Sequence, residues 1–382
     1  MGKAPVTARI ARAVSDLPAA EWDALTAKGS GAANPFMRHA CLSALEQSGS
    51  VGGRSGWTTL ALVIEDEAGT LAAALPAYLK QHSQGEYVFD HSWADAWQRA
   101  GGAYYPKLQI AAPFTPATGP RLLTSDPAYA PVLLAAAEKL CEIHGLSSAH
   151  ATFVEPTQIA LFEAAGWLIR SDIQFHWHNR GYASFDDFLA ALSSRKRKAI
   201  RKERAAAQEG VDIRAFSGND IRPEHWDAFW EFYQDTGSRK WGRPYLTRAA
   251  FELFGETMGE DIVLMLAFVG DTPIAGALNF LGREALYGRY WGCSLDKPFL
   301  HFELCYYQAI DLAIARGLSR VEAGAQGPHK LARGYEPVQT FSAHWIADPG
   351  FRAAIEDFLE RERAGVAQDQ VYLGERTPFR KT

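Results

Sequence analysis

The chain has 382 residues, of which 47% are hydrophobic, and a formal net charge of −5 at pH 7. This length exceeds what one hydrophobic core usually holds, so we expect two domains, and the negative charge excludes a protein that coats nucleic acid with its whole surface. The four cysteines show neither C-x-x-C spacing nor a Cys/His cluster, which argues against a metal and favours free thiols in the cytoplasm. No apolar run reaches the roughly 18 residues of a membrane span, so none is expected.

An internal repeat organises the chain. Asp16-Leu17 and the run 22–25 recur at the same spacing as Asp220-Ile221 and the run 226–229. A hairpin of two apolar strands around a Gly/Asp turn follows in each half, as LALVIEDEAGTLAAALPAYL and LMLAFVGDTPIAGALNFLGR. The repeat predicts that both halves of the chain share one α/β arrangement.

The second part of the repeat follows the hairpins. An aromatic strand is expected in each half, EYVFDH and ALYGRYWG, and then a helix that ends at Gly145 or Gly317. The spacing from Gly166-Trp167 to His176-Trp177 also recurs, from Gly334-Tyr335 to His344-Trp345. We therefore predict two units of strand, helix, hairpin, strand, helix, strand, helix and strand.

The first half carries an insertion, roughly residues 92–126, after its aromatic strand. Its aromatic and proline content predicts an ordered loop. In one interpretation, five residues in or beside it line a cleft and hold a polar acceptor: Asp90, Trp93, Asp95, Tyr105 and Lys107. In the other, the rings seal the apolar edge of the lobe and the charges are solvated.

The connecting segment, SFDDFLAALSSRKRKAIRKERAAAQEG, predicts a helix or helix pair ending at Gly210. Leu192, Ala199 and Ala206 share one face at helical spacing, so the basic faces should point outward. The cations proposed to contact phosphates of a tRNA or an acyl-CoA are Arg195, Arg197, Lys198, Arg201 and Lys202. The alternative is a solvated basic face balanced by acidic neighbours.

The candidate active site falls between Tyr287 and Pro337. This stretch predicts an aromatic strand, a helix beginning near Phe299, a short strand ending at Glu322, and a loop with Gln326, His329, Lys330 and Arg333. Strand ends and helix starts are common positions for functional residues in α/β proteins.

Antiparallel strands followed by a β-α-β crossover are similar to the GNAT acyltransferase fold, and a tandem pair resembles the FemAB/FemX-type peptidoglycan acyltransferases. The closer resemblance is to the bacterial FemAB-like family of peptidoglycan biosynthesis or recognition. It rests on blocks spread from Asn34 to Pro337, including NPFMRHACLSALEQSGSVGGRSGW, PFTPATGPRLL, SSRKRKAIRKER, RYWGC, HFELCYYQ and EAGAQGPHKLARGYEP. The resemblance implies an α/β fold of two tandem GNAT-like lobes with mixed central sheets, divided as residues 1–182, a basic connector 183–210, and 211–382.

The resemblance also implies transfer of an acyl or aminoacyl group to an amine, with a peptidoglycan precursor or another amino compound as acceptor. This reaction needs a proton acceptor, oxyanion donors and a scaffold that aligns the reactants. We expect the catalytic groups among Glu303, His301, Glu322 and His329, although Glu303 is equally explained as an acid at a helix start and a lone histidine is often structural.

In GNAT-like lobes the central strand holds the donor carbonyl, which corresponds here to about 288–292, with Tyr290 and Trp291 as walls. Lys297, Lys330 and Arg333 are the expected anion contacts. The loop GCSLDKPFLHF lacks the glycine pattern that cradles a CoA pyrophosphate, so acyl-CoA and aminoacyl-tRNA both remain candidate donors. The alternative functions are an acyl-CoA-dependent acyltransferase of a small amine and a non-catalytic protein that binds a cell-wall fragment or RNA.

Overall fold

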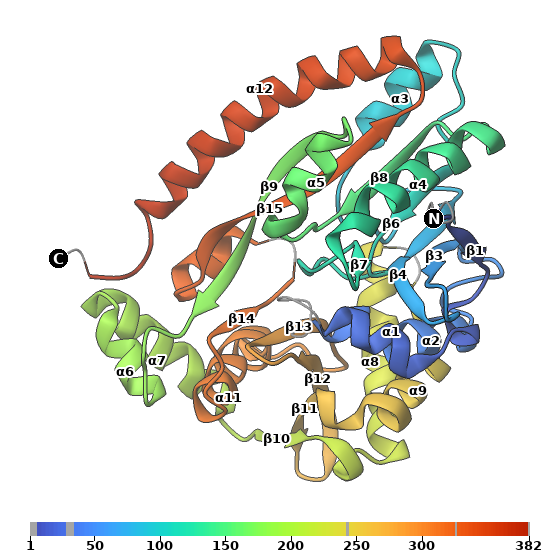
Figure 1. Ribbon diagram of the computed structural model, residues 1–382. Coiled ribbons are helices and arrows are strands. Elements are labelled where there is room, and N and C mark those ends of the chain that lie inside the picture. Colours follow the sequence, from blue (N-terminus) through green and yellow to red (C-terminus); the bar gives the residue numbers. More distant parts are fainter. Residues whose placement is uncertain (1–5, 28–33, 242–243, 325–326, 381–382) are drawn as a thin grey trace. The chain divides into compact units, whose positions relative to one another are not determined.

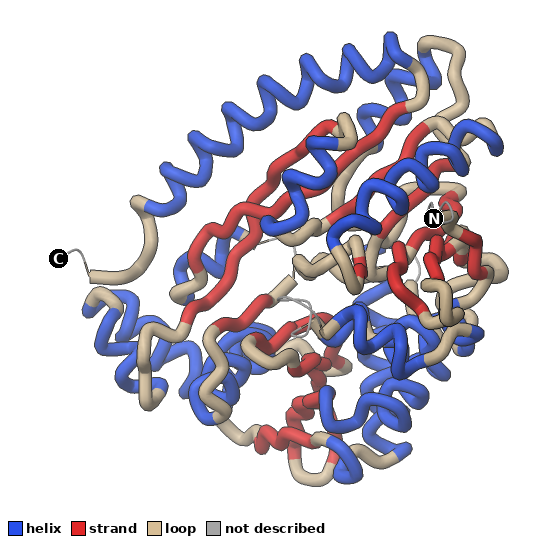
Figure 2. The backbone as a smooth tube through the Cα atoms, in the orientation of Figure 1, coloured by secondary structure: helices blue, strands red, loops and turns tan. Residues whose placement is uncertain are grey.

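The computed structural model describes residues 6–27, 34–241, 244–324 and 327–380 (Figure 1). Helices and strands both occur throughout this described part of the chain, as the tube in Figure 2 shows. The chain forms two compact units. Unit 1 comprises Met1–Asp172 and Gln339–Ala367, and unit 2 comprises Ile173–Val338 and Gln368–Thr382.

Unit 1 contains two sheets. The smaller has the order β1 (Arg9–Ala11), β3 (Ala61–Glu65), β4 (Leu71–Leu75) and β7 (Leu123–Thr124), all antiparallel. The larger has the order β15 (Glu336–Ile346), β8 (Ser148–Thr152), β6 (Lys107–Ile110), β5 (Ala77–Lys80) and β2 (Trp57–Thr59). In this second sheet β6 and β8 are parallel and the other pairs are antiparallel.

The helices of unit 1 are α1 (Ala19–Thr26), α2 (His39–Gln47), α3 (His91–Arg99), α4 (Ala130–His144), α5 (Ile159–Ala164) and most of α12 (Pro349–Gly374). The core forms where α4 packs its apolar face, including Leu133, Ala137 and Cys141, on strand residues such as Ile64 and Ile110. The apolar side chains at helical spacing on α4 therefore give this unit its main hydrophobic cluster.

Unit 2 is built on one sheet with the order β10 (Asp212–Phe216), β11 (Ile262–Val269), β12 (Thr272–Leu281), β13 (Ala285–Cys293), β14 (Arg320–Glu322) and β9 (Leu168–His178). Only β13 and β14 are parallel among the paired strands of this described sheet. Its helices are α6 (Phe185–Ala191), α7 (Ser194–Gln208), α8 (Pro223–Trp241), α9 (Arg248–Met258), α10 (Leu300–Phe302), a π-helical turn Glu303–Tyr307, and α11 (Gln308–Ala315).

Helices cover both faces of the unit 2 sheet. On one face α8 approaches so closely that a Cβ at Gly292 would lie 2.0 Å from the carbonyl oxygen of Phe232, and one at Gly276 would lie 2.8 Å from the Phe229 ring. Glycine is therefore required at both strand positions. On the other face, side chains of α10, the π-helical turn and α11 pack against alternate residues of β11 and β12.

The last strand of each half of the sequence completes the sheet of the other unit. The end of β9 pairs with β14, with His176 opposite Glu322. The end of β15 pairs with β8, with His344 opposite His150. His176 and His344 thus occupy equivalent positions in the two strands, which explains why the spacing from Gly166-Trp167 to His176-Trp177 recurs from Gly334-Tyr335 to His344-Trp345. The division of the chain into residues 1–182, 183–210 and 211–382 stays a prediction. Each compact unit consists of two separate stretches of the chain, because the ends of β9 and β15 lie in the unit formed mainly by the other half of the sequence.

Most local elements agree with the sequence. The two hairpins are β3–β4 and β11–β12, ALYGRYWG is β13, and a helix pair forms the connector. Gly145 and Gly317, just past their helices, have the expected left-handed backbone with φ of 62° and 65°.

Three local predictions are wrong. EYVFDH forms no strand, because Glu86 and Asp90 turn inward to the buried ammonium of Lys107. The insertion is not simply a loop, since it contains α3 and β6. The inward residues of α7 are Ile200 and Ala207, one position beyond those expected, which buries the larger side chain of Ile200 and leaves Ala199 exposed.

Candidate functional site

Strands β13 and β14 separate after three residue pairs. The last pair is Tyr287 with Glu322, and β13 then continues to Cys293 along β12. A bulge accompanies this separation, because Leu278 lies opposite Tyr290 and Asn279 opposite Gly288, which leaves Arg289 as an extra residue. Backbone groups of residues 288–291 that point away from β12 thus border an opening in the sheet.

A pocket of about 120 Å³ occupies this opening. Its lining residues come from β12, the bulged half of β13, the helix after it and the end of β14: Ala277, Leu278, Asn279, Gly288, Arg289, Tyr290, Trp291, His301, Cys305, Tyr306, Ala323 and Gly324. Of the residues predicted from the sequence, the pocket brings together Tyr290, Trp291 and His301.

His301 belongs to an aromatic wall of this pocket. Its ring lies 5.2 Å from that of Trp291 and 5.5 Å from that of Tyr306. The Tyr306 hydroxyl in turn is 2.9 Å from Nε2 of His329, which is exposed. Burial raises the pKa of Tyr306, so this phenol stays protonated at neutral pH. His329 is thus joined to the pocket through Tyr306.

Glu303 is fully buried at the start of the π-helical turn and is not among the pocket residues. Its Oε1 accepts hydrogen bonds from Arg204 Nη2 at 3.0 Å, Gln208 Nε2 at 2.7 Å and Gln308 Nε2 at 2.8 Å. Arg204 also pairs with Asp311 at 2.6 Å. The carboxylate therefore ties α7 to the helix that borders the pocket.

Other contacts fix the same two segments to each other. Glu203 of α7 accepts hydrogen bonds from the Tyr307 hydroxyl and, at 3.0 Å, from Arg333 Nη2. The Arg333 guanidinium also lies 3.4 Å from the centre of the Phe302 ring, and Lys297 donates to the backbone oxygen of Glu209. Lys297 and Arg333 are thus engaged by these internal contacts.

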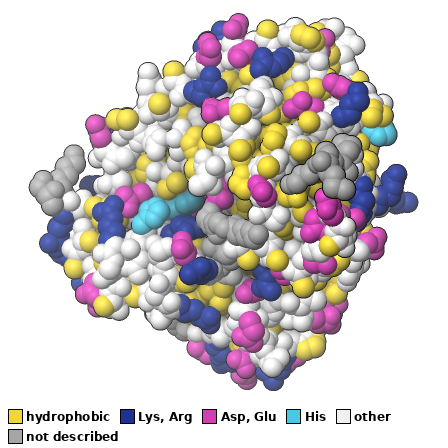
Figure 3. Space-filling view, in the orientation of Figure 1, with side chains coloured by type: hydrophobic (Ala, Val, Ile, Leu, Met, Phe, Trp, Pro, Cys, Tyr) yellow, Lys and Arg dark blue, Asp and Glu magenta, His cyan; other side chains and the backbone are white. Residues whose placement is uncertain are grey.

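The outer surface of α7 carries five cations that we call the basic face: Arg195, Arg197, Lys198, Arg201 and Lys202. Arg201 pairs with Asp186 at 2.8 Å, with both side chains more than half exposed. The other four have no ion-pair partner among the residues that the structure describes. Figure 3 shows cations and acidic groups interspersed over one face of the molecule, so positive charge does not cover that whole face.

Two predicted residues lie behind the pocket wall. Lys330 is 1% exposed, and its Nζ donates to the backbone oxygen of Gly324 at 2.8 Å. Burial lowers the pKa of Lys330 to about 7. Glu322 accepts from Arg320 Nε at 2.9 Å and lies 3.7 Å from His176 Nε2. Neither side chain is among the pocket residues.

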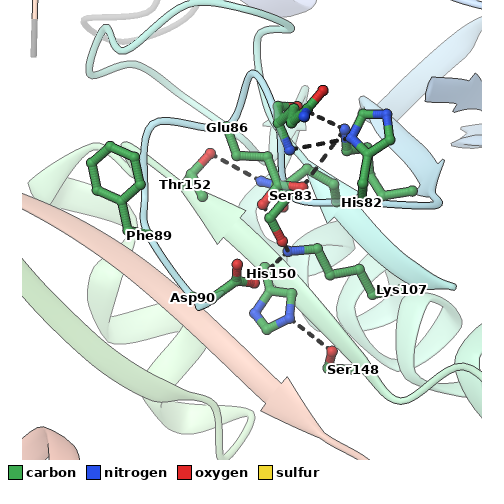
Figure 4. Close-up of polar contacts among 12 residues, drawn as sticks. His82, Ser83, Glu86, Phe89, Asp90, Lys107, Ser148, His150 and Thr152 are labelled. Atoms are coloured by element: carbon green, nitrogen blue, oxygen red, sulfur yellow. Dashed lines mark hydrogen bonds and ion pairs between the residues drawn. The ribbon is translucent and has the colours of Figure 1, made fainter. Parts of the chain in front are cut away.

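None of the five residues predicted to bind an acceptor in unit 1 lines a described pocket, and two of them, Asp90 and Lys107, belong to an internal network (Figure 4). The Lys107 ammonium, fully buried, donates to Ser83 Oγ at 2.8 Å, to Glu86 at 2.7 Å and to Asp90. Burial alone would raise the pKa of Asp90, but Lys107 holds it well below its usual range. Lys107 and Asp90 therefore form a permanent buried ion pair.

The other three residues predicted to bind an acceptor, Tyr105, Trp93 and Asp95, lie in different surroundings. Tyr105 bonds through its hydroxyl to Ser83 Oγ at 2.8 Å. Trp93 is buried, with its ring 4.9 Å from that of His344, whereas Asp95 is exposed on α3. The buried ring of Trp93 agrees with the interpretation that the rings seal an apolar edge. The solvated charges of that interpretation are wrong for Asp90 and Lys107, which are 2% and 0% exposed because they pair with each other inside the unit.

Sequence reasoning missed several residues of these sites. In the pocket it missed Asn279, Arg289, Cys305 and Tyr306, of which Tyr306 and Cys305 stood in the quoted block HFELCYYQ. In unit 1 it missed His150, whose Nδ1 lies 2.7 Å from Nδ1 of His344. Burial, helped by Lys107, lowers the pKa of His150 to about 3, so this histidine is neutral. The sequence offered one signal near this pair, because His344 occupies the same place in the repeat as His176. Gln326 lies outside the described residues.

Among the described residues, no group of three or more His, Cys, Asp or Glu side chains is arranged to hold a metal ion. In the same described residues, no helix is long and apolar enough to cross a bilayer.

Several solved structures have a similar fold over most of this chain. FemX superimposes with a TM-score of 0.54 at 12% identity, over 89% of this chain and 98% of that one. The C-terminal domain of a putative lysylphosphatidylglycerol synthetase from Agrobacterium fabrum gives 0.55 at 9% identity, over 89% and 95%. L-PGS from Bacillus licheniformis gives 0.53 at 9% identity, over 90% and 97%. No curated protein sequence matches the chain significantly.

The fold and the opened strand pair define an α/β protein of two tandem GNAT-like lobes, which confirms the fold class predicted from the sequence. A family model for FemAB-like proteins of peptidoglycan biosynthesis/recognition matches residues 13–381. The chain belongs to the FemAB-like family.

Proposed function

We propose that this protein is an N-acyltransferase that moves an acyl or aminoacyl group to an amine. The observation that carries the proposal is the pocket between the separated strands β13 and β14, where backbone groups of residues 288–291 and the His301 side chain border one small cavity. Membership of a family of peptidoglycan biosynthesis/recognition and the likeness to FemX support a peptidoglycan precursor as the acceptor.

The pocket supplies the groups that acyl transfer needs. Attack by an amine on the donor carbonyl gives a tetrahedral intermediate whose oxygen carries negative charge. Backbone N–H groups bordering the pocket stabilise that oxygen, and Arg289 adds positive charge at the same wall. Trp291, Tyr290 and Tyr306 exclude water from the acyl group.

The proton of the attacking amine passes to His301 in this proposal, because it is the pocket residue with a basic ring nitrogen. Collapse of the intermediate restores the carbonyl and breaks its bond to the ester oxygen of the tRNA or the sulfur of CoA, and this leaving group takes the proton from His301. In this proposal His329 holds the Tyr306 side chain in place at the pocket wall through its hydrogen bond to the Tyr306 hydroxyl. Glu303 acts as a positioning residue that holds α7 against the helix of His301, and Glu322 occupies the end of β14, where the pocket opens.

The phosphates of the donor lie against the basic face of α7 in this proposal. Aminoacyl-tRNA is the donor that the exposed cations and the missing glycine loop favour, and acyl-CoA is the alternative. The acceptor is then a peptidoglycan precursor or a small amine. A non-catalytic role in binding a cell-wall fragment or RNA is the competing function, and a transfer assay separates the two.

The test of catalysis is the substitution His301→Asn, which removes the basic nitrogen and keeps a polar side chain. Loss of a general base lowers turnover by about 10²- to 10⁴-fold. The assay follows transfer of a radiolabelled aminoacyl or acetyl group to a peptidoglycan precursor peptide, and the exposed His91→Asn variant is the control. Equal turnover in His301→Asn and wild type would contradict the assigned role.

The basic face is tested separately by neutralising Arg197, Lys198 and Lys202 to Gln. If these cations contact phosphates, donor affinity falls and log Kd depends less steeply on log salt concentration. A matched variant that changes Arg12, Arg54 and Lys139 to Gln alters net charge equally, away from α7. The same loss in both variants would show a general charge effect instead of a phosphate contact.

A further inference from the structure

Asn279 carries an unsatisfied carbonyl oxygen at the pocket wall. The side chain is fully buried on β12, and its Nδ2 donates to the backbone oxygens of Val263 and Ala277, each at 3.3 Å. Oδ1 has no hydrogen-bond partner among the residues that the structure describes. An unpaired buried acceptor costs about 1–3 kcal/mol, so this oxygen requires an explanation.

The orientation of this amide follows from its neighbours. A flipped side chain would set the oxygen against two backbone carbonyl oxygens and lose both hydrogen bonds, so the nitrogen faces the strand carbonyls. The bulge opposite Asn279 places Gly288 directly across from it. The oxygen is therefore fixed in position before any ligand binds.

Gly288 leaves space beside the oxygen. A Cβ at residue 288 would lie 3.4 Å from Asn279 Oδ1 and 3.7 Å from Cα of Ala323, which are ordinary contact distances. Its backbone is not in the left-handed region. Alanine at this position therefore fits without strain, and its methyl group would occupy the space next to the acceptor oxygen.

The charge of the pocket restricts the ligand group. Among the described residues, its lining includes the cation of Arg289 and contains neither Asp nor Glu. The buried amine of Lys330 lies behind Gly324. An ammonium group at Oδ1 would be repelled by the Arg289 cation at the same wall, whereas a neutral N–H donor meets no such repulsion.

We propose that Asn279 Oδ1 accepts a hydrogen bond from a neutral amide N–H of the ligand, which makes Asn279 a specificity-determining residue of the pocket. The inference rests on the proposed function and names the chemistry that its pocket selects. Two ligands offer this group: the amide-containing arm of an acyl-CoA, and a peptide acceptor. The chemistry is the same in both, so the experiment distinguishes the sources.

The test uses calorimetry with acetyl-CoA, with the uncharged peptide N-acetyl-Ala-Ala-methylamide, and with that peptide methylated on its amide nitrogens. Two variants change the site differently: Gly288→Ala fills the space beside the oxygen, and Asn279→Leu removes the oxygen. Gly365→Ala is the control, since a Cβ there meets nothing within 4 Å. Thermal melting verifies that each variant is folded, and Gly288→Ala keeps the test usable if Asn279→Leu is not.

A site built to accept an N–H rejects partners that lack it, so both variants should weaken binding of the recognised probe about tenfold, and the control should not. Loss with acetyl-CoA alone assigns the amide to the donor. If both variants weaken binding of the peptide, and methylating the peptide weakens its binding to wild type equally, the amide belongs to the acceptor.

Two outcomes overturn the inference. If Gly288→Ala binds acetyl-CoA and the peptide as tightly as wild type while transfer activity is present, the proposed function stands and the role of Asn279 falls. If neither probe binds wild type at millimolar concentration and no transfer occurs, the proposed function falls with it.

Discussion

Two parallel strand pairs, one in each unit, share a register but differ beyond their last paired residues. Gln109 pairs with His150 between β6 and β8 in unit 1, as Tyr287 pairs with Glu322 between β13 and β14 in unit 2. Past the paired residues, unit 2 has a pocket, whereas the unit 1 chain folds back on itself. Gly119 there bridges to the end of β8, donating to Phe153 and accepting from Glu155, each at 3.1 Å.

Arg121 completes the closure of unit 1. It is fully buried, and its guanidinium donates to the backbone oxygens of Thr152 at 2.8 Å and Ala117 at 2.9 Å. Burial lowers the pKa of Arg121 to about 9. The groups that a ligand would meet in unit 2 are thus satisfied by the protein itself in unit 1. A duplicated fold can therefore keep one binding site and use the second copy as scaffold.

The buried lysines extend the comparison. Lys107 in unit 1 lies among carboxylates: burial alone would lower its pKa, but Glu86 and Asp90 raise it. Lys330 in unit 2 donates to a backbone carbonyl, and burial lowers its pKa to about 7. Lys107 thus balances charge in unit 1. Burial lowers the pKa of Lys80, beside it, to about 7, the same value as for Lys330, but Lys80 lies 3.8 Å from a carboxylate and Lys330 lies beside the pocket.

The largest effect is expected for Lys107→Met. Removing the ammonium leaves Asp90 buried without its counter-ion and leaves Glu86 with only Lys80, whose Nζ is 3.8 Å away, which should lower the free energy of unfolding by about 3–5 kcal/mol. Urea denaturation measures this loss. Lys139→Met, which breaks the exposed Lys139–Glu142 pair, is the control and should change stability by less than about 1 kcal/mol. Equal effects of the two substitutions would show that the unit 1 network is not a balanced buried cluster.

A second effect, which depends on pH, is expected for Lys330→Met. The folded-state pKa lies below the unfolded value, so the unfolded state binds more protons between about pH 7 and 10 and wild-type stability rises with pH across that window. The gain in stability of the variant over wild type should therefore be greatest at pH 7 and below and shrink towards pH 10. The change is at most about 1.4 kcal/mol per pH unit. A difference that does not vary with pH would mean that Lys330 keeps its ordinary pKa.

Much of the fold could be predicted because local sequence signals specify it. The hairpin turns, the glycines past the helix ends and the aromatic run of β13 are each readable within a few residues. The exchange of β9 and β15 could not be predicted, because strand pairing over such sequence distances has no local signature. The coil at residues 86–90 arises from the long-range partner Lys107, which outweighs local strand propensity.

The site was predictable in part for the same reason. Tyr290, Trp291 and His301 lie at strand and helix ends, where sequence reasoning looks for function, and the structure brings them to one pocket. Asn279 gave no signal, because its importance depends on a bulge in the neighbouring strand. Glu303 was seen as a candidate base, but its three partner side chains come from both α7 and its own helix, which a pattern within one helix does not reveal.

On this view, the donor binds at the open strand pair of unit 2 and not at the closed pair of unit 1. Amide hydrogen exchange, measured with and without aminoacyl-tRNA or acetyl-CoA, tests it most directly. We predict slower exchange on donor binding in peptides covering residues 288–291 and no change in those covering Lys107–Ile110. Protection of Lys107–Ile110, with residues 288–291 unaffected, would contradict the claim.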